Sequence, residues 1–269
     1  MIPSMCLLIA LHRAHPEAPL VVAANRDELL ARPASPMGVL REAGPRILGG
    51  RDLLAGGTWL AVNRHGVVGG LTNRPSRGRP RARRSRGEWP LFLARRTTAR
   101  RAARDFAAAF DPGDFGAGWV LVGDGEGLFY VEMAPGVEPR PRELEPGIHI
   151  LENRALEATS PKVDLVRALL AGVEGRELSS LPELLHGVLS SHDLPPDLGD
   201  PPDPELPWKP KAALAPCVHA DGYGTRSSTI VVLSAGAAPP RLWHADGPPC
   251  TTPHVERSEL WLPEEPSPP

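Results

Sequence analysis

The sequence predicts an α+β fold in which antiparallel sheets are covered by helices. Short apolar runs bounded by Gly, Pro or Asp recur along the chain and often follow one another closely. This spacing favours antiparallel pairing over repeated βαβ units. Helical periodicity is confined to the middle of the chain, between groups of predicted strands, and this grouping is typical of stacked sheets with helical layers outside them.

The individual elements follow from local pattern. Apolar residues recur at three- and four-residue spacing in Trp89–Phe110, Lys162–Ala171 and Leu181–Ser190, which predicts helices, and Pro161 suits the first turn of the second. Short apolar runs flanked by turn residues predict strands. The predicted strands are Cys6–His12, Leu20–Ala24, Thr58–Val62, Val67–Thr72, Trp119–Gly123, Leu128–Met133, Ile148–Leu151, Ala215–His219, Ser228–Leu233, Arg241–Ala245 and Glu259–Leu262.

Composition is that of a globular protein. The chain has 269 residues, of which 41% are hydrophobic, enough to bury a sizeable core. We expect one domain over residues 1–262, with a Pro-rich surface loop at 192–210 and a disordered tail at 263–269. The formal net charge of −2 provides no global attraction for nucleic acid, so nucleic acid is not an expected partner.

The cysteines indicate a reducing compartment. Cys6, Cys217 and Cys250 form no CxxC pair and no even framework, which argues against a disulfide scaffold. The apolar run that begins at Cys6 lacks a basic segment before it and is too short for a signal sequence, and no later segment reaches membrane-spanning length. We therefore expect a cytoplasmic protein without a transmembrane segment or a lipid anchor.

A polar motif follows the second predicted strand. Leu20–Arg32 reads LVVAANRDELLAR, and taken alone it favours a capped turn in which Arg26 pairs with a neighbouring acid. Other motifs follow in order: Gly56-Gly57-Thr58-Trp59-Leu60, Gly70-Leu71-Thr72-Asn73, Arg86-Gly87-Glu88 and Gly222-Tyr223-Gly224-Thr225-Arg226-Ser227-Ser228-Thr229-Ile230.

Together with the Met-Cys pair near the start, these motifs resemble the NRDE family, also called the transport and Golgi organisation family, along nearly the whole chain. That family is similar to N-terminal-nucleophile hydrolases of the choloylglycine hydrolase and penicillin acylase type, which implies a four-layer αββα sandwich. Family members usually begin Met-Cys, whereas Met1–Ser4 precede Met5 here. Either Met5 is the initiator and is removed, or a short propeptide is released, so that Cys6 becomes the first residue.

The resemblance implies a catalytic site centred on Cys6. Its thiolate would attack an amide or ester carbonyl, while its own α-amine, with an ordinary pKa of about 7.7 to 8.0, would shuttle the proton. Asp27 would hold that amine, and Arg26 or Arg226 would lower the pKa of the thiol. Without the resemblance, Cys6 would be interpreted as a small buried hydrophobic residue.

Two asparagines would complete the site implied by the resemblance. Asn73 ends a predicted strand, and its amide would supply an oxyanion-hole donor worth about 3 to 4 kcal/mol. Asn153 matches the second asparagine of the family, although Glu152 stands where the family more usually has serine. From the residues alone, Asn73 also fits a strand-end turn, and Arg226 also fits a structural arginine in a Gly-rich bend.

A basic segment follows Asn73. Between Arg74 and Arg86 the chain carries arginines interleaved with Pro, Ser and Gly, which predicts a loop at the mouth of the pocket. Guanidinium groups there would bind a phosphate or carboxylate, although a solvated loop explains the composition equally well. The candidate ligand-binding residues are Arg77, Arg79, Arg81, Arg83 and Arg84.

Cys217 and His219 share one face of a predicted strand, but a single Cys-x-His pair is a weak metal signature. The sequence analysis therefore predicts no metal site and no cofactor. The resemblance implies a cysteine amidohydrolase or acyltransferase, and the arginines after Asn73 favour a small anionic acyl compound as its substrate. The alternative is a carrier that binds haem or acyl-CoA in the same pocket without turnover. Oligomeric state is not predicted.

Overall fold

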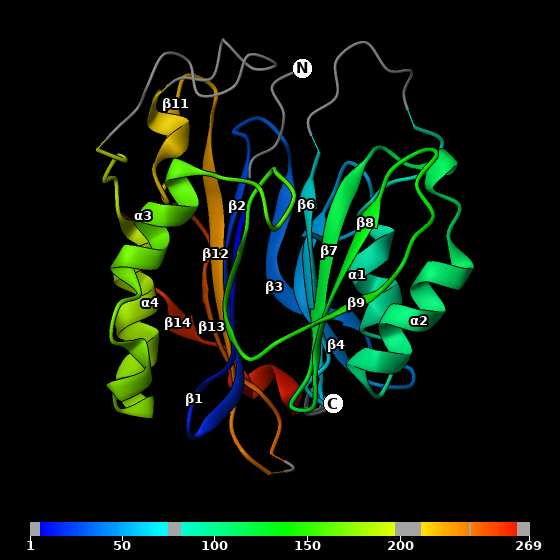
Figure 1. The fold of residues 1–269 in the computed structure, drawn as a ribbon, viewed down its shortest axis with the longest axis horizontal. Helices are drawn as coiled ribbons and strands as arrows, with labels where there is room; N and C mark the ends of the chain where they lie inside the picture. Colours follow the sequence, from blue (N-terminus) through cyan, green and yellow to red (C-terminus); the bar gives the residue numbers. More distant parts are fainter. Residues whose placement is uncertain (1–5, 75–81, 197–210, 237, 263–269) are drawn as a thin grey trace, which may run out of the picture.

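The chain folds into two antiparallel sheets packed face to face, with a pair of helices on each outer face (Figure 1). The computed structural model describes residues 6–74, 82–196, 211–236 and 238–262. The four layers confirm the predicted α+β class and the αββα sandwich that the family resemblance implied.

The first sheet contains the first and the last strand of the chain and has the order β10-β1-β2-β12-β13-β14, with β11 paired to β12. Long central strands pair over most of their length, and β2 lies between β1 and β12. The strands are β1 (Cys6–His15), β2 (Ala18–Leu29), β10 (Gly147–Leu151), β11 (His219–Ala220), β12 (Tyr223–Leu233), β13 (Arg241–Ala245) and β14 (Val255–Glu256).

The second sheet is a simple meander in which each strand pairs with the next along the chain. Except for the segment between Asn73 and Gly118, which contains helices, the strands are joined by short connections, as suits antiparallel pairing. Its strands are β3 (Ala34–Arg41), β4 (Ile47–Asp52), β5 (Leu60–Asn63), β6 (Val68–Asn73), β7 (Gly118–Gly123), β8 (Leu128–Met133) and β9 (Arg142–Leu144).

Helices α1 (Glu88–Leu93) and α2 (Ala99–Ala109) cover the second sheet, and α3 (Pro161–Leu169) and α4 (Leu181–Ser190) cover the first (Figure 1). Pro161 occupies the first turn of α3, as predicted, and the Ser160 side chain caps that helix. Short 3-10 turns are η1 (Pro112–Asp114), η2 (Val173–Gly175), η3 (Leu178–Ser180), η4 (Lys211–Leu214) and η5 (Ser258–Trp261).

Alternation along the strands divides the core into layers. In β1, Leu8 and Ala10 belong to the cluster between the sheets, whereas Leu7 and Ile9 pack toward α3 and α4. Successive side chains of a strand point to opposite faces, so this parity also fixes the orientation of the polar residues at the strand ends. The helices over the second sheet pack Trp89 and the other aromatic residues of that layer against β6, β7 and β8.

The structure corrects three sequence predictions. The predicted strand Glu259–Leu262 is wrong, because the 3-10 turn η5 occupies Ser258–Trp261 and Trp261 Nε1 donates to Pro240 O, 2.7 Å away. The predicted strand Ala215–His219 is largely wrong, since only His219 belongs to a strand. The predicted helix Trp89–Phe110 is two helices, because Thr98 ends the connection and caps α2 with its side chain.

The longest helix in the described part of the chain has 11 residues, and no helix there has the length and apolarity needed to cross a membrane.

Candidate functional site

Cys6 lies at the start of β1 and faces the second sheet. It pairs with Arg26 of β2 and shares the parity of Leu8 and Ala10, which lie in the core between the sheets. The Cys6 residue is buried, with 6% of its surface exposed. A thiol at this place is held at the end of a rigid strand and is largely shielded from water.

Asn153 connects Cys6 to the second sheet. The backbone N of Cys6 donates to Asn153 Oδ1 at 2.9 Å, and Asn153 Nδ2 donates to the backbone oxygen of Asn73, the last residue of β6. Asn153 is buried and Asn73 is half-buried. The structure therefore brings Cys6, Asn153 and Asn73 together, as the resemblance implied, with Asn153 as the link.

Arg26 projects from β2 into the space between the sheets. Its guanidinium lies over the ring of Trp59, 4.4 Å from the ring centroid, and its Nη2 is 3.3 Å from Asp52 Oδ2. Arg32 Nε approaches the same oxygen at 2.6 Å. Burial alone would raise the pKa of the Asp52 carboxyl, but the hydrogen bond from Arg32 and the charges of both arginines hold it below the ordinary value. Asp52 therefore stays ionised and pairs with both Arg26 and Arg32.

Asp27 lies on the opposite face of β2, toward α3. Thr225 Oγ1 donates to Asp27 Oδ1 at 2.6 Å, and Lys162 Nζ is 4.0 Å from Asp27 Oδ2, with both charged side chains almost completely buried. Burial raises the pKa of Asp27 to about 6, although Lys162, Thr225 and Arg26 act in the opposite direction. This carboxyl therefore changes charge close to neutral pH.

Arg226 is the extra residue of a β-bulge in β12. Thr225 pairs with Asp27 and Ser227 pairs with Arg26, so the ladder shifts by one residue at Arg226. Its half-buried guanidinium donates to the carbonyl oxygens of Leu29 and Leu30. These contacts place the Arg226 charge against the C-terminal end of β2.

Arg86 is a site residue for which the sequence analysis assigned no role. Burial lowers the pKa of its guanidinium to about 10, and the negative charges of Cys6 and Glu28 counteract part of this effect. Arg86 Nη1 donates to the neutral carbonyl of Ala117 at 2.7 Å. This acceptor is neutral, so the charge of Arg86 interacts with both Cys6 and Glu28, whereas Arg26 pairs with Asp52. The signal in the sequence was the Arg86-Gly87-Glu88 motif.

Two glycines hold Arg86 in position. Thr58 N donates to Gly87 O at 3.0 Å, which brings the backbones of the two glycine motifs into contact. A Cβ at Gly57 would lie 2.5 Å from the carbonyl carbon of Gly87, so any larger residue would push the two segments apart. This contact explains why glycine stands in both motifs.

Sequence comparison identifies the family of the chain. Residues 5–237 match the family described as "Transport and Golgi organisation 2". The chain is 30% identical over 238 residues to the Transport and Golgi organization protein 2 homolog of Bos taurus, covering 80% of this chain and 82% of that protein. The chain belongs to this family. The mouse homolog, from Mus musculus, is 28% identical over 237 residues with the same coverage.

Solved structures similar to this family member are N-terminal-nucleophile hydrolases, and the likeness concerns the fold. A variant of the conjugated bile acid hydrolase from Clostridium perfringens superposes with a TM-score of 0.54 at 10% identity, covering 93% of this chain and 92% of that chain. The Caenorhabditis elegans ortholog of N-acylethanolamine-hydrolyzing acid amidase gives a TM-score of 0.52 at 12% identity, with 84% and 92% covered.

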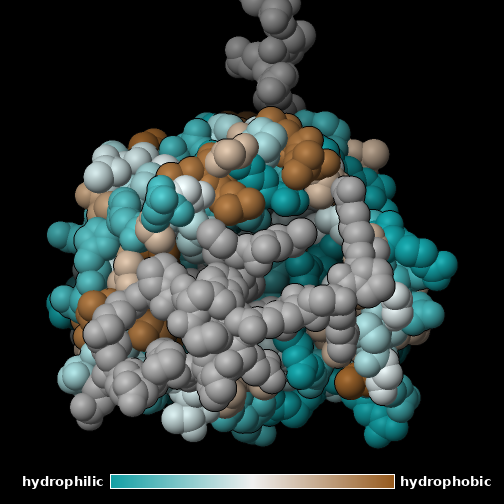
Figure 2. All heavy atoms as spheres, turned by 90° about the horizontal axis from the view of Figure 1, so that it is seen from above, coloured by the Kyte–Doolittle hydropathy of each residue, from teal (hydrophilic) through white to brown (hydrophobic). Residues whose placement is uncertain are grey.

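Figure 2 shows from above the end of the molecule at which β1 begins and β6 ends, and hydrophilic residues are visible near the middle of this face.

The candidate ligand-binding arginines in the described part of the chain have acidic partners. Arg83 is 2.7 Å from Asp114 Oδ1, and Arg84 is 2.5 Å from Glu88 Oε2 and lies over the ring of Phe115. Arg77, Arg79 and Arg81 lie outside the described residues.

Proposed function

We propose that this family member is an N-terminal-nucleophile cysteine hydrolase or acyltransferase acting on a small anionic acyl compound. The observation that carries the proposal is the contact of the Cys6 backbone N with Asn153 Oδ1 at 2.9 Å, beside a thiol under the influence of Arg86. In a chain that begins at Cys6, this nitrogen is an amine held in place next to its own thiol. An amine so placed can act as the base for the thiol.

The proposed reaction follows from these positions. The α-amine takes the thiol proton, Cys6 Sγ attacks the acyl carbonyl carbon, and the amine returns the proton to the leaving group as the C–N, C–O or C–S bond breaks. Water, or an acceptor nucleophile, then cleaves the thioester on Cys6 and releases the acyl group. The Asn73 side-chain amide is proposed as a donor to the oxyanion, and Asn153 as the residue that orients the amine.

An anionic substrate is favoured by the cationic groups around the thiol. Arg86 is near Cys6, and the arginines proposed for ligand binding follow Asn73 in the chain. An acyl chain that ends in a carboxylate, or an acyl-CoA with its phosphates, would complement these charges. Arg26 has a different role in this proposal, because its pairing with Asp52 makes it a positioning residue that packs on Trp59.

The proposal is tested with chain that starts at Cys6, its first residue verified by intact mass. Anionic acyl amides and acyl-CoAs are incubated with wild type and with Cys6→Ala, and both product release and the acyl adduct on the protein are measured. We expect product from the wild type, a trapped adduct that maps to Cys6, and loss of both in Cys6→Ala. Binding of acyl-CoA or haem with equal affinity to both proteins and no turnover would instead identify a carrier.

A further inference from the structure

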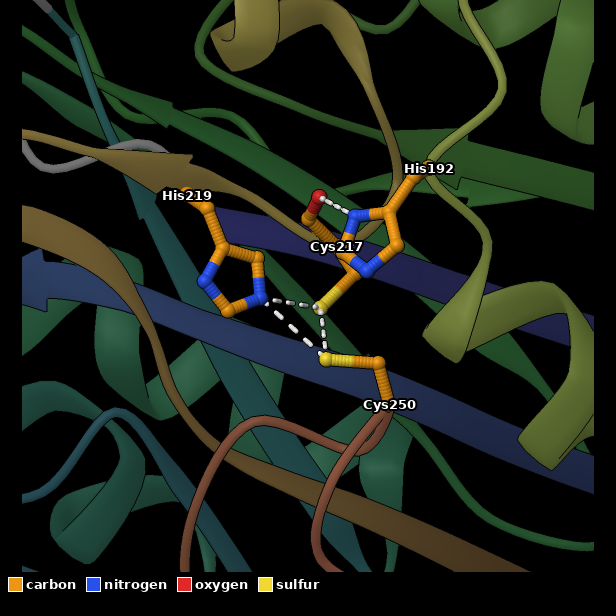
Figure 3. A group of neighbouring side chains, drawn as sticks. All are labelled: His192, Cys217, His219 and Cys250. Atoms are coloured by element: carbon orange, nitrogen blue, oxygen red, sulfur yellow. Dashed lines mark hydrogen bonds between the residues drawn. The ribbon is translucent and has the colours of Figure 1, made fainter.

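Four side chains with metal-binding chemistry gather at a place separate from Cys6. His192 follows α4, Cys217 lies just before β11, and His219 is the first residue of β11. Cys250 lies in the segment between β13 and β14 (Figure 3). One potential ligand atom from each residue lies within 4.8 Å of all the others. In the sequence only Cys217 and His219 stand together, because His192 and Cys250 are distant in the chain and only folding brings them there.

The distances in this cluster fit tetrahedral zinc. Zn–S bonds of about 2.3 Å and Zn–N bonds of about 2.0 to 2.1 Å, at tetrahedral angles, separate two sulfurs by about 3.8 Å and a sulfur from a nitrogen by about 3.5 Å. Cys217 Sγ and Cys250 Sγ are 3.7 Å apart, and His219 Nε2 is 3.8 Å from the first and 3.2 Å from the second. These three residues therefore already have nearly tetrahedral spacing, and the ligand atom of His192 lies within 4.8 Å of each of them.

The surrounding contacts orient the ligands as metal sites require. His192 Nδ1 lies 3.1 Å from the backbone oxygen of Cys217, so this nitrogen carries the proton and Nε2 keeps its lone pair for a metal. Cys217 N donates to Ser191 O at 2.9 Å, which fixes the segment before β11 against the end of α4. Cys217 is buried, whereas both histidines are exposed. One ligand is therefore fixed in the protein interior, and an ion can reach the cluster from solvent.

A disulfide explains the cluster less well than a metal. The sulfurs of Cys217 and Cys250 are free and 3.7 Å apart, whereas a disulfide requires about 2.05 Å. A disulfide would also give no reason for two imidazoles to converge on the same sulfurs, with ring centroids 4.9 Å apart.

We propose that His192, Cys217, His219 and Cys250 form a structural Zn²⁺ site. Two thiolates and two neutral imidazoles balance the charge of the ion, and binding releases the two thiol protons to solvent. Four protein ligands fill a tetrahedral coordination sphere, so the site has no position for a substrate and is structural. This proposal does not depend on the function proposed for Cys6.

The zinc site would support the layer behind Asp27. Val218, between two of the ligands, donates its backbone N to Thr225 Oγ1 at 2.9 Å, and the same hydroxyl donates to Asp27 Oδ1 at 2.6 Å. Coordination of Cys217 and His219 would therefore fix the segment that holds Thr225 against Asp27. Cys250 would bind the segment after β13 to the same place, and closing such long loops stabilises the folded state.

The test measures metal in the full chain, purified with reductant and without chelator. Zinc per chain is determined by inductively coupled plasma mass spectrometry, and Co²⁺ is titrated into metal-free protein to record thiolate-to-cobalt and tetrahedral d–d absorption. We expect one ion per chain, the absorption of an S2N2 site, and a lower melting temperature after chelation. Cys250→Ser and His219→Ala, which change partly exposed positions, should lower zinc affinity at least about tenfold.

Cys6→Ser is the matched control, because it removes the remaining cysteine of the chain and should leave the zinc content unchanged. Its Co²⁺ spectrum should also equal that of the wild type. The proposal is overturned if reduced wild-type protein, with all its thiols titratable, binds neither Zn²⁺ nor Co²⁺, or if Cys250→Ser binds both as tightly as the wild type. A Cys217–Cys250 disulfide that persists when the protein is purified in the presence of zinc and reductant would also overturn it.

Discussion

Replacing Asp27 by Asn should remove a contribution to the stability of the protein that falls as the pH rises from 4 to 7. The Asp27 carboxyl is completely buried, and burial raises its pKa from 3.8 to about 6 despite the opposing effects of Lys162 and Thr225. A carboxyl that binds its proton more tightly in the folded chain than in the unfolded chain stabilises the fold when protonated. This stabilisation is complete below about pH 3.8 and is lost as the pH rises through about 6.

The magnitude follows from the two pKa values. Raising the pKa from 3.8 to about 6, at about 1.4 kcal/mol per tenfold change in proton affinity, corresponds to about 3 kcal/mol. About 2 kcal/mol of this difference develops between pH 4 and pH 7. Asn has nearly the same shape, still accepts a hydrogen bond from Thr225 and does not titrate. The free energy of unfolding of the wild type, relative to Asp27→Asn, should therefore fall by about 2 kcal/mol over this range.

Urea unfolding of both proteins at several pH values measures this difference. Burial lowers the pKa of His244 to about 4 and of His254 to about 3, but these groups titrate alike in both proteins and cancel in the comparison. Asp52→Asn is the matched control with the opposite sign, because the pKa of Asp52 is lowered and its ionised form stabilises the fold. A wild-type minus Asp27→Asn difference that is flat, or that rises with pH, would show that Lys162 stabilises ionised Asp27 and would refute the reasoning.

Three further predictions concern the surroundings of Cys6. Gly57→Ala should lower the free energy of unfolding by at least about 2 kcal/mol, because its Cβ would collide with the backbone of Gly87. Gly56→Ala should lower it by about 1 kcal/mol, because Gly56 has a φ of 75° but open space around its Cβ position. Equal losses in urea unfolding would exclude the backbone contact as the cause. Arg86→Gln should slow iodoacetamide alkylation of Cys6 near pH 7 several-fold, with Arg86→Lys intermediate, and an unchanged rate would remove Arg86 from the site. Neutralising the arginines after Asn73 together should weaken acyl-CoA binding. Because salt screens the attraction, the loss of affinity should be smaller at physiological salt than at low salt. Equal affinities of the variant and the wild type in isothermal titration calorimetry would show that the segment is only solvated surface. The arginines replaced are Arg77, Arg79, Arg81, Arg83 and Arg84.

Strand periodicity predicted the centre of the fold and failed at its edges. Segments such as Leu128–Met133 and Arg241–Ala245 coincide with β8 and β13, because buried strands consist of apolar runs. The strands β3 and β4 carry Pro, Gly and Arg and were not predicted. At Gly50, a Cβ would lie 2.3 Å from the Trp59 ring, so glycine is required there by packing across the sheet, which local pattern does not reveal.

The helix that was predicted as one element shows the same limit. Apolar spacing continues from Trp89 to Phe110, yet the connection between α1 and α2 is fixed by contacts from elsewhere in the sequence. Asn63 Nδ2 donates to the carbonyl oxygens of Ala94 and Arg96, and Asp124 Oδ2 accepts from the first amide of α2. These contacts satisfy the backbone groups that a continuous helix would have used.

The candidate site was predictable where a motif named its residues. The resemblance pointed to Cys6, Asn73 and Asn153, and the structure joins them through hydrogen bonds. Arg86 stands in the Arg86-Gly87-Glu88 motif, but its role was not predicted, because its charge interaction with Cys6 depends on segments that only folding brings together. Periodicity does place Arg26 and Asp27 on opposite faces of β2, but their partners come from other elements.

The nitrogen of Cys6 connects the two functions considered for this fold. A backbone amide there donates its hydrogen to Asn153 and has no basic lone pair, so a chain with residues before Cys6 keeps this contact but lacks the proposed base. An amine at the same position makes the same contact and can also accept the thiol proton. Under the proposal, cleavage of the peptide bond before Cys6 supplies the base that converts a binding site into a hydrolase. Protein that retains residues 1–5 should therefore bind the same anionic acyl compounds but release no product from them.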